Sequence, residues 1–330
     1  MARVLVTGAS GFIGRHVVMQ LSRDGYAVRA TGRDAGRLAV LGRYAQTVRA
    51  DLATDPLDAL VDGCTAVVHC AALSSPWGRA EAFALANVEA TARLLAAAAR
   101  TGVARFVHLG SPSIYFRFAD QYDLDESFQS PRRWITAYAR SKWQSEQLVR
   151  GADRGRLHTV ILRPRAVFGD GDQAILPRLL AVAGSGRFPL IHAGRARIDI
   201  TPVESVVHAI GQALQAGPAS RGRAYNISNG TPVQVRALVQ SLFEQLQMQV
   251  RLVPVPRALA VALAGAAELA AHCRPGRPEP RLTRYGVGVL GYSQTLDIRA
   301  ARRDLGYAPA LSIDAALARF AQAWHAGRSS

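Results

Sequence analysis

Two residues spaced like neighbours on one face of a helix, Tyr138 and Lys142, are the strongest chemical signal in this sequence. Side chains four positions apart in a helix stand about one turn apart on the same side. A free tyrosine has a pKa of about 10 and exchanges protons poorly at neutral pH, but a neighbouring cation stabilises the phenolate and lowers that pKa. Lys142 is the only lysine among 40 basic residues. A compact ammonium that must also hydrogen-bond a ligand's hydroxyl groups explains why arginine does not replace it.

Ser111, in the stretch "HLGSPSIY", supplies a third polar group after a predicted buried strand. Its hydroxyl could hydrogen-bond a substrate oxygen that gains negative charge during reaction. Ser113 lies two residues further on and is the alternative, but we prefer Ser111. The three residues Ser111, Tyr138 and Lys142 therefore predict proton transfer to or from an oxygen atom.

A glycine-rich stretch, "VLVTGASGFIG", joins the first predicted strand to the first predicted helix. Its glycines allow a tight turn and let the backbone approach a pyrophosphate at the start of a helix, where negative charge is favoured. The spacing GxxGxxG differs from GxGxxG but meets the same demands. We predict a dinucleotide cofactor here, with contacts from Gly8, Ser10, Gly11, Phe12, Ile13 and Gly14.

The end of the second predicted strand, "YAVRATGRDAGR", favours NADP(H) over NAD(H). Where an NAD-binding site would place a carboxylate on the ribose, this chain has Gly32 and then Arg33. Arginine can make a charge-assisted contact with a 2′-phosphate, which a carboxylate would repel. Arg33 could instead be one more arginine of an arginine-rich chain. The other predicted cofactor contacts are Asp51 and Leu52 at the adenine, Ala71 and Ala72 beside the cofactor, and Tyr138, Lys142, Pro164 and Val167.

Short apolar runs alternate with helical patterns and predict an α/β fold with a doubly wound parallel sheet. The strands are expected at 3–7, 27–31, 47–50, 66–69, 105–109 and 159–162, and the main helices at 13–23, 80–100 and 137–150. We expect a Rossmann domain over residues 1–170, with segments near 198–228 returning to it, and a smaller, mainly substrate-binding lobe over 171–330.

The net charge of +16 does not by itself indicate a nucleic-acid-binding protein. The arginines are scattered, with no long basic run and no interleaved aromatic residues, so we expect no nucleic-acid partner. The three cysteines have no metal-ligand spacing, and we predict no metal. Without a signal-peptide pattern or an uninterrupted apolar run of about 18 residues, we expect a cytoplasmic protein. The apolar helix near 257–271 could be core, lid or a membrane-surface contact.

Five motifs in the same order resemble the extended short-chain dehydrogenase/reductase superfamily: "TGASGFIG", "HCAAL", "SPSIY", "YARSK" and "RPRAVFG". The resemblance implies a nicotinamide cofactor and a C-terminal substrate lobe. It also implies that Ser111 polarises a carbonyl, Tyr138 transfers the proton, and Lys142 holds the ribose and tunes Tyr138. "YAVRATGRD" is similar to the NADPH-binding stretch of dihydroflavonol-reductase-like members.

Longer stretches, including "ALSSPWG", "EPRLTRY" and "ARRDLGYAPALSIDAAL", resemble the 3β-hydroxysteroid dehydrogenase-like branch, and within it the bacterial 2-alkyl-3-oxoalkanoate reductases. That implies a lipophilic substrate with a carbonyl or hydroxyl group. Nucleotide-sugar epimerases and dehydratases are the main alternative. Their resemblance implies an asparagine that helps to hold the sugar nucleotide, and this chain has Ala166 at that place. Arg165 could meet a substrate carboxylate or could brace its loop. The predicted substrate pocket comprises Trp77, Ser113, Tyr115, Phe116, Arg165 and Phe188.

We therefore expect an NADPH-dependent oxidoreductase that transfers hydride to or from a 3-oxoacyl or steroid-like substrate. A non-catalytic NADP(H)-binding regulatory protein is an alternative from another class, because a fold alone does not establish catalysis. The resemblance also implies a homodimer, paired through helices 80–100 and 137–150. We expect His69, His108 and His192 to be core histidines and Asp199 to orient the returning segment.

Overall fold

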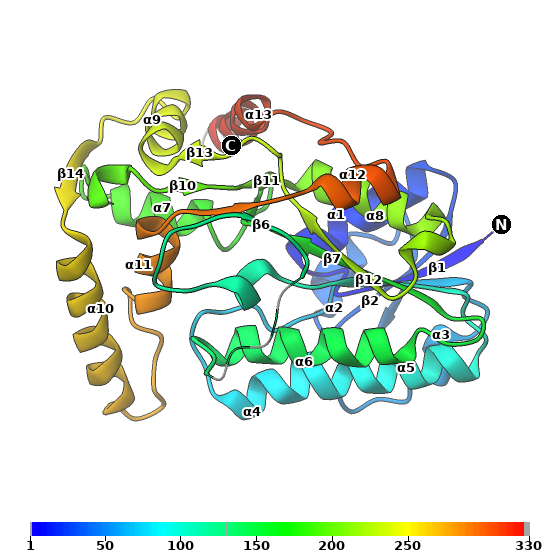
Figure 1. Ribbon diagram of the computed structural model, residues 1–330. Helices are drawn as coiled ribbons and strands as arrows, with labels where there is room; N and C mark the ends of the chain where they lie inside the picture. Colours follow the sequence, from blue (N-terminus) through cyan, green and yellow to red (C-terminus); the bar gives the residue numbers. More distant parts are fainter. Residues whose placement is uncertain (1, 128, 130, 132, 327–330) are drawn as a thin grey trace.

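Seven parallel strands form the central sheet of the structure, a computed structural model that describes residues 2–127, 129, 131 and 133–326 (Figure 1). Their order across the sheet is β12-β7-β5-β4-β1-β2-β3. The strands are β1 (Arg3–Thr7), β2 (Ala27–Gly32), β3 (Gln46–Arg49), β4 (Ala66–His69), β5 (Arg105–Leu109), β7 (His158–Pro164) and β12 (Arg223–Ile227).

The chain changes direction across the sheet at β1. It first moves outward through β2 and β3, and then returns to the other side of β1 to form β4, β5, β7 and β12. In doubly wound sheets a ligand binds at the carboxyl ends of the strands beside such a reversal. The carboxyl ends of β1 and β4, where this reversal occurs, are followed by the glycine turn and by the "AAL" stretch.

Helices cover both faces of the sheet because successive strand residues point to opposite faces. Val4 and Val6 belong to a buried cluster with α1 (Phe12–Arg23) and α8 (Val203–Gln215). Leu5, between them, belongs to a second cluster with α3 (Asp58–Val61), α5 (Ala90–Arg100) and α6 (Ala137–Ala152). Figure 1 shows α5 and α6 lying side by side along one face. Strands buried on both sides explain the unbroken apolar runs of the sequence.

The segment predicted as one helix over 80–100 consists of α4 (Ala80–Phe83), a π-helical turn (Ala84–Glu89) and α5. By length and composition alone this helix could cross a membrane. Its Leu94, Ala97 and Ala98 lie in the cluster beneath the sheet, which is typical of a core helix. A π-turn in a helix often marks a functional position.

A smaller lobe forms mainly from the chain after β7, together with β6 (Gln121–Leu124), which precedes β7. It contains a sheet of β13 (Val233–Gln234), β10 (Arg197–Ile198), β15 (Gln294–Leu296) and β6, and the pairs β8 (Val167–Phe168) with β11 (Thr201–Pro202) and β9 (Arg187–Ile191) with β14 (Arg251–Val255). Its helices are α7 (Leu176–Ala183), α9 (Val235–Gln245), α10 (Arg257–His272), α11 (Arg284–Gly291) and α13 (Ile313–Ala326), while α12 (Arg299–Leu305) packs against β12. The short helix α2 (Ala35–Ala39) follows β2 in the large domain.

The doubly wound α/β fold expected from the sequence is confirmed. Each of the six predicted strands is present, with ends that differ by at most two residues. The predicted returning segments correspond to α8, which covers the sheet, and β12, which extends it next to β7. The boundary near residue 170 stays a prediction.

Candidate active site

The turn between β1 and α1 requires glycine at two of its three predicted positions. Gly8 has φ of 66°, and a Cβ atom there would lie 2.6 Å from the Ala71 backbone nitrogen. A Cβ on Gly14 would overlap the Gly8 carbonyl group, because α1 starts directly against the turn. The loop is thus drawn tightly against β4 and α1. Such a turn leaves backbone N–H groups at a helix N-terminus free to receive a pyrophosphate.

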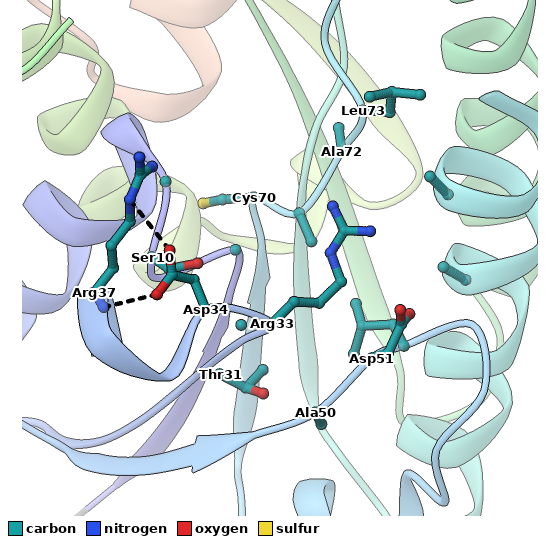
Figure 2. A pocket seen from close by; sticks show the side chains of 17 residues that line it. Ser10, Thr31, Arg33, Asp34, Arg37, Ala50, Asp51, Cys70, Ala72 and Leu73 are labelled. Carbon is teal, nitrogen blue, oxygen red and sulfur yellow. Dashed lines mark hydrogen bonds and ion pairs between the residues drawn. The ribbon is translucent and has the colours of Figure 1, made fainter. Parts of the chain in front are cut away.

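A pocket of about 340 Å³ opens beside this turn (Figure 2). Of the predicted cofactor contacts, Gly8, Ser10, Gly11, Arg33, Asp51, Leu52, Ala71 and Ala72 line it. Phe12 and Ile13, the first two residues of α1, are partly buried against the core and do not line this pocket. Pro164 ends β7 and Val167 lies in β8, so neither lines this pocket and both stay predictions. The residues present fit a dinucleotide, because glycines and small residues leave room for a phosphate-bearing ligand.

Charged groups gather where β2 ends in this pocket. Figure 2 shows the exposed Arg33 side chain extending into the pocket, while Arg37 is paired with Asp34. The Asp34 side chain caps α2 by accepting from the Arg37 backbone N–H at 3.0 Å, and its carboxylate lies 3.4 Å from Arg37 Nε. Sequence reasoning missed Asp34 and Arg37 as lining residues. The sequence did contain a signal for Arg37: it follows Arg33 by four residues, and side chains at this spacing lie on the same face of a helix.

The three predicted catalytic residues come together at the carboxyl end of β5. Ser111 follows that strand, and its Oγ accepts from the Ser113 N–H at 3.2 Å. Tyr138 lies in the first turn of α6, where the Thr136 side chain caps the helix. The Tyr138 hydroxyl is hydrogen-bonded by Ser111 and also by Ser74. Lys142 is buried and donates to the carbonyl oxygen of Leu109, the last residue of β5.

The pKa of Tyr138 differs from the expectation drawn from its spacing to Lys142. Burial raises the pKa of this tyrosine, and the hydrogen bonds from Ser111 and Ser74 lower it by less. The predicted net lowering is therefore not observed: the Lys142 ammonium is directed to the Leu109 carbonyl, and desolvation outweighs the serine donors. Burial lowers the pKa of Lys142 to about 8, which the nearby Glu146 carboxylate partly opposes.

Ser74 was not predicted as a site residue, and the structure explains how it arrives there. It lies in the loop after β4, which Asn87 in the π-helical turn holds in place. Asn87 accepts from the Leu73 N–H at 2.7 Å, donates to the Leu73 carbonyl at 3.0 Å, and donates to Ser141 Oγ of α6 at 2.9 Å. The π-turn thus ties this loop to the helix that carries Tyr138. The stretch "ALSSPWG" was singled out in the sequence, but nothing in it identified Ser74.

The predicted substrate-pocket residues divide into two groups. Phe116 meets the ring of Tyr285 edge-on, with 5.1 Å between centroids, and Tyr285 is hydrogen-bonded to Arg165. Trp77 donates from Nε1 to the Arg277 carbonyl at 2.9 Å and so joins the loop after β4 to the segment between α10 and α11. Ser113 Oγ is buried with no hydrogen-bond partner among the described residues.

Two other predicted pocket residues belong to structural packing instead. Phe188 lies in the core of the smaller lobe, against Phe243 at 5.6 Å between ring centroids. The Tyr115 hydroxyl accepts from Arg163 and donates to Asn226 Oδ1 at 2.8 Å. Their aromatic character suggested a lipophilic pocket, but local sequence does not tell which apolar surface a ring will cover.

The apolar helix expected near 257–271 is α10, which buries Ala260, Ala264 and Ala271 and exposes Leu259, Leu263 and Leu269.

One solved structure with a similar fold is that of DesIV, a dTDP-glucose 4,6-dehydratase from Streptomyces venezuelae, with NAD and TYD bound. It is 26% identical, with a TM-score of 0.77, and the match covers 99% of this chain and 98% of that one. The doubly wound architecture is thereby confirmed independently.

Curated relatives match along nearly the whole chain. YbjS of Escherichia coli (strain K12), described as uncharacterized, is 38% identical over 98% of this chain and 97% of its own. A 2-alkyl-3-oxoalkanoate reductase of Stenotrophomonas maltophilia (strain K279a) is 35% identical over 96% and 98%. A 3 beta-hydroxysteroid dehydrogenase/Delta 5-->4-isomerase of Mycobacterium tuberculosis (strain CDC 1551 / Oshkosh) is 31% identical over 96% and 89%.

These relatives confirm the resemblance to the 3β-hydroxysteroid dehydrogenase-like branch and the expectation of an NAD(P)-dependent enzyme. The model of one protein family, described as NAD dependent epimerase/dehydratase family, matches residues 4–228, from the first strand through the last strand of the large sheet. The chain belongs to the NAD dependent epimerase/dehydratase family.

Proposed function

We propose that this protein is an NADPH-dependent oxidoreductase that interconverts a carbonyl and a hydroxyl group on a lipophilic, 3-oxoacyl or steroid-like substrate. One observation carries the proposal: the Tyr138 hydroxyl is hydrogen-bonded by Ser111 and Ser74 and stands one turn from a buried lysine on α6. This arrangement suits proton transfer at a single oxygen atom.

Each residue then has a role set by its position. Ser111 donates to the substrate oxygen as negative charge develops on it. Tyr138 donates its proton to the same oxygen during reduction, and its raised pKa keeps the hydroxyl protonated beforehand. Lys142 supplies the cation that stabilises the resulting phenolate, and it binds the cofactor ribose. The bound cofactor supplies hydride in the reducing direction and accepts it in the oxidising direction.

The preference for NADPH is supported by the charges at the end of β2. Arg33 lines the pocket with no carboxylate paired to it among the described residues, whereas Asp34 is occupied by Arg37 and by the α2 backbone. An arginine free to contact a 2′-phosphate favours the phosphorylated cofactor. A Cβ on Gly32 would lie 2.5 Å from Ser10 Oγ, so a carboxylate residue at that position would require the Ser10 hydroxyl to move.

The substrate class is supported by the aromatic surroundings and by the relatives' names. Phe116, Phe118 and Tyr285 cluster by edge-on contacts near the reaction site. The relatives include a 2-alkyl-3-oxoalkanoate reductase and a steroid dehydrogenase. The alternative, a nucleotide-sugar epimerase or dehydratase, is favoured by the structural match to DesIV. Ala166, with φ of 45°, offers no side-chain amide to a sugar at that position.

The test follows NADPH absorbance with long-chain 2-alkyl-3-oxo acids, 3-oxosteroids, plain aldehydes and a UDP-sugar. Oxidation of NADPH by the oxo acids or steroids supports the proposal. Conversion of the UDP-sugar alone would establish the epimerase alternative. Tight NADPH binding with no turnover of any compound would favour the regulatory alternative, which the assembled Ser111–Tyr138–Lys142 group argues against.

The partner expected for this chain is a second copy. Exposed small residues on α5 and α6, including Ala96, Ala99 and Gly151, line a groove with the half-exposed Leu148. Small side chains let helices of two subunits approach closely. A second subunit that covers the groove would remove its apolar surface from water, which favours association. Light scattering tests this: a mass of twice 35.4 kDa supports a dimer, and a mass of 35.4 kDa contradicts it. Ala96→Glu places a charge in the groove and should convert a dimer to monomers.

A further inference from the structure

Arg165 is a buried cation whose hydrogen-bonding capacity is largely unused. Its side chain is 4% exposed, and its Nε and Nη2 atoms have no hydrogen-bond partner among the described residues. Burying a charged group without partners is costly, so such a group needs a reason to persist. Its backbone is held firmly, because its N–H donates to the Ile227 carbonyl at 3.0 Å and the Thr201 hydroxyl donates to its own carbonyl. The backbone of Arg165 is therefore fixed in place, while the Nε and Nη2 donors of its guanidinium group have no partner among the described residues.

The chain itself shows what that edge can hold. Two residues earlier, Arg163 uses the same two atoms to bind both oxygens of the Glu146 carboxylate: Nε donates to Oε1 at 3.2 Å, and Nη2 donates to Oε2 at 2.7 Å. Nε and Nη2 are parallel donors on one side of the guanidinium plane, and they match the two oxygens of a carboxylate. Arg163 thus has an internal carboxylate, and Arg165 has the same donors without one.

The nearest internal anion does not fill this place. Asp199 influences the pKa of Arg165, but its Oδ1 atom and the Arg165 Nε and Nη2 atoms all have no hydrogen-bond partner among the described residues. One Asp199 oxygen accepts from the Leu296 N–H at 2.7 Å, which fixes the carboxylate on β15. The side-chain bond that Arg165 does make is to the Tyr285 hydroxyl.

Tyr285 connects this arginine to the reaction site. Its ring meets Phe116 edge-on, and a Cβ on Gly288 of the same helix would overlap Phe116, so α11 is pressed against that ring. Tyr138 also contributes to raising the pKa of Tyr285, to about 12, with burial as the main cause. Arg165 and Tyr138 therefore both interact with Tyr285, which links the arginine to the reaction site.

We propose that Arg165, assisted by Tyr285, binds the free carboxylate of a substrate whose carbonyl or hydroxyl carbon reacts at Tyr138. The substrate class is then a lipophilic 3-oxo or 3-hydroxy acid rather than a neutral ketone. This rests on the proposed function and names its substrate more closely. The carboxylate is unchanged by the reaction. In reduction the carbonyl π bond breaks, its carbon gains hydride from NADPH, which becomes NADP⁺, and its oxygen gains a proton from Tyr138.

The experiment compares a 2-alkyl-3-hydroxy acid with its methyl ester as substrates for oxidation with NADP⁺. Wild type should prefer the acid, and Arg165→Gln should lose about 100-fold in kcat/KM for the acid, mostly through KM, as expected for two lost charge-assisted bonds. The ester should change less than about threefold, because it makes no such bonds. Arg165→Lys should recover part of the loss, and Tyr285→Phe should show a smaller acid-specific loss. Arg187→Gln, at an exposed position on β9, is the matched control and should change neither substrate.

Stability separates a binding role from a bracing role. Because an unpaired buried charge is removed, the melting temperature of Arg165→Gln should be no lower than that of wild type. With NADP⁺ present, the hydroxy acid should raise the melting temperature of wild type more than the ester does, and the variant should lose this difference. A lower melting temperature with equal losses for acid and ester would identify a structural brace and overturn the proposal.

Two outcomes distinguish this inference from the function on which it rests. If wild type oxidised acid and ester equally well, the oxidoreductase function would stand and the carboxylate site would be wrong. If wild type oxidised neither compound and reduced no carbonyl, the proposed function would fail. The thermal shift would still decide the carboxylate site in that case: the same stabilisation by acid and ester would overturn it.

Discussion

Glu146 and Arg163 form an ion pair of 2.7 Å in which neither side chain has any exposed surface. Glu146 lies one turn beyond Lys142 on α6, and Lys142 lies one turn beyond Tyr138. Glu146 also packs so close to Gly110 that a Cβ there would overlap it. The pair thus holds the Glu146 side chain near Lys142 and joins α6 to β7. The Glu146 carboxylate favours the ammonium form of Lys142 and so opposes the lowering of the Lys142 pKa by burial.

Removing the Tyr138 hydroxyl should abolish turnover. Tyr138→Phe keeps the ring against Phe83 but removes the proton donor and the partner of Ser111 and Ser74. We expect kcat to fall by about 10³-fold, within the range for loss of general acid catalysis. NADPH affinity, measured by fluorescence titration, should be nearly unchanged. Activity retained by this variant would contradict the mechanism.

Arginine should not replace Lys142. The side chain is 2% exposed and points its ammonium at the Leu109 carbonyl, so the larger planar guanidinium would not fit in the same geometry. Lys142→Arg should lower kcat/KM at least about 100-fold, since both the phenolate and the ribose lose their partner. The converse exchange at an exposed position of the same helix, Arg140→Lys, is the control and should leave steady-state kinetics unchanged. Equal effects of the two exchanges would show that position 142 needs only positive charge.

The rate of reduction should fall at high pH. Burial lowers the pKa of Lys142 to about 8, so the ammonium is present below that pH and is lost above it. We expect kcat/KM to decline above pH 8 by about tenfold per unit, as for a single essential ionisation. Glu146→Gln removes the charge that raises this pKa and should move the decline to lower pH. The variant should also be less stable, because Arg163 is left unpaired, so the folded fraction is measured at each pH by circular dichroism and the rates are corrected for it. An unmoved profile would mean that Lys142 is not the group that titrates.

Cofactor choice should depend on Arg33. Wild type should use NADPH with a higher kcat/KM than NADH, and comparable efficiency with both would contradict the assignment. Arg33→Gln should cost about 10- to 100-fold in kcat/KM with NADPH and little with NADH, because only the 2′-phosphate loses a charge-assisted bond. Arg37→Gln should have a smaller effect, since Arg37 is already paired with Asp34.

The folded state should lose stability in mild acid through its buried histidines. His69 bonds Thr7 Oγ1 at 2.7 Å and Thr91 Oγ1 at 2.9 Å, and burial lowers its pKa to about 3. The unfolded chain therefore takes up a proton below about pH 6.5 that the folded chain refuses until about pH 3. This group contributes stability that is present above pH 6.5 and is lost as the pH falls, by about 1.4 kcal/mol per unit. Urea unfolding at several pH values measures the slope, and His69→Gln should make it shallower by that amount. An unchanged slope would show that His69 is protonated in the folded protein.

Sequence patterns alone predicted the fold class and eight of the residues that line the pocket beside the glycine turn. Unbroken apolar runs require strands buried on both faces, and the glycine turn is legible because only glycine meets its backbone demands. The pair Tyr138 and Lys142 was predictable because helical spacing alone places both on one face. Ser111 was predicted from its position after a strand, since strand ends in a parallel sheet meet at one edge.

Which side chains from distant segments meet at the site could not be predicted from the sequence, because it depends on the assembled fold. Ser74 reaches Tyr138 because Asn87 holds its loop, and Tyr285 reaches Arg165 although 120 residues separate them in the chain. Phe188 and Phe116 look alike in sequence, yet one packs in the smaller lobe and the other meets Tyr285. The pKa of Tyr138 rises rather than falls because desolvation depends on everything that surrounds the hydroxyl. The spacing of residues in the sequence predicts which side chains lie on the same helix or strand. The burial of a side chain and its hydrogen-bond partners depend on the assembled core.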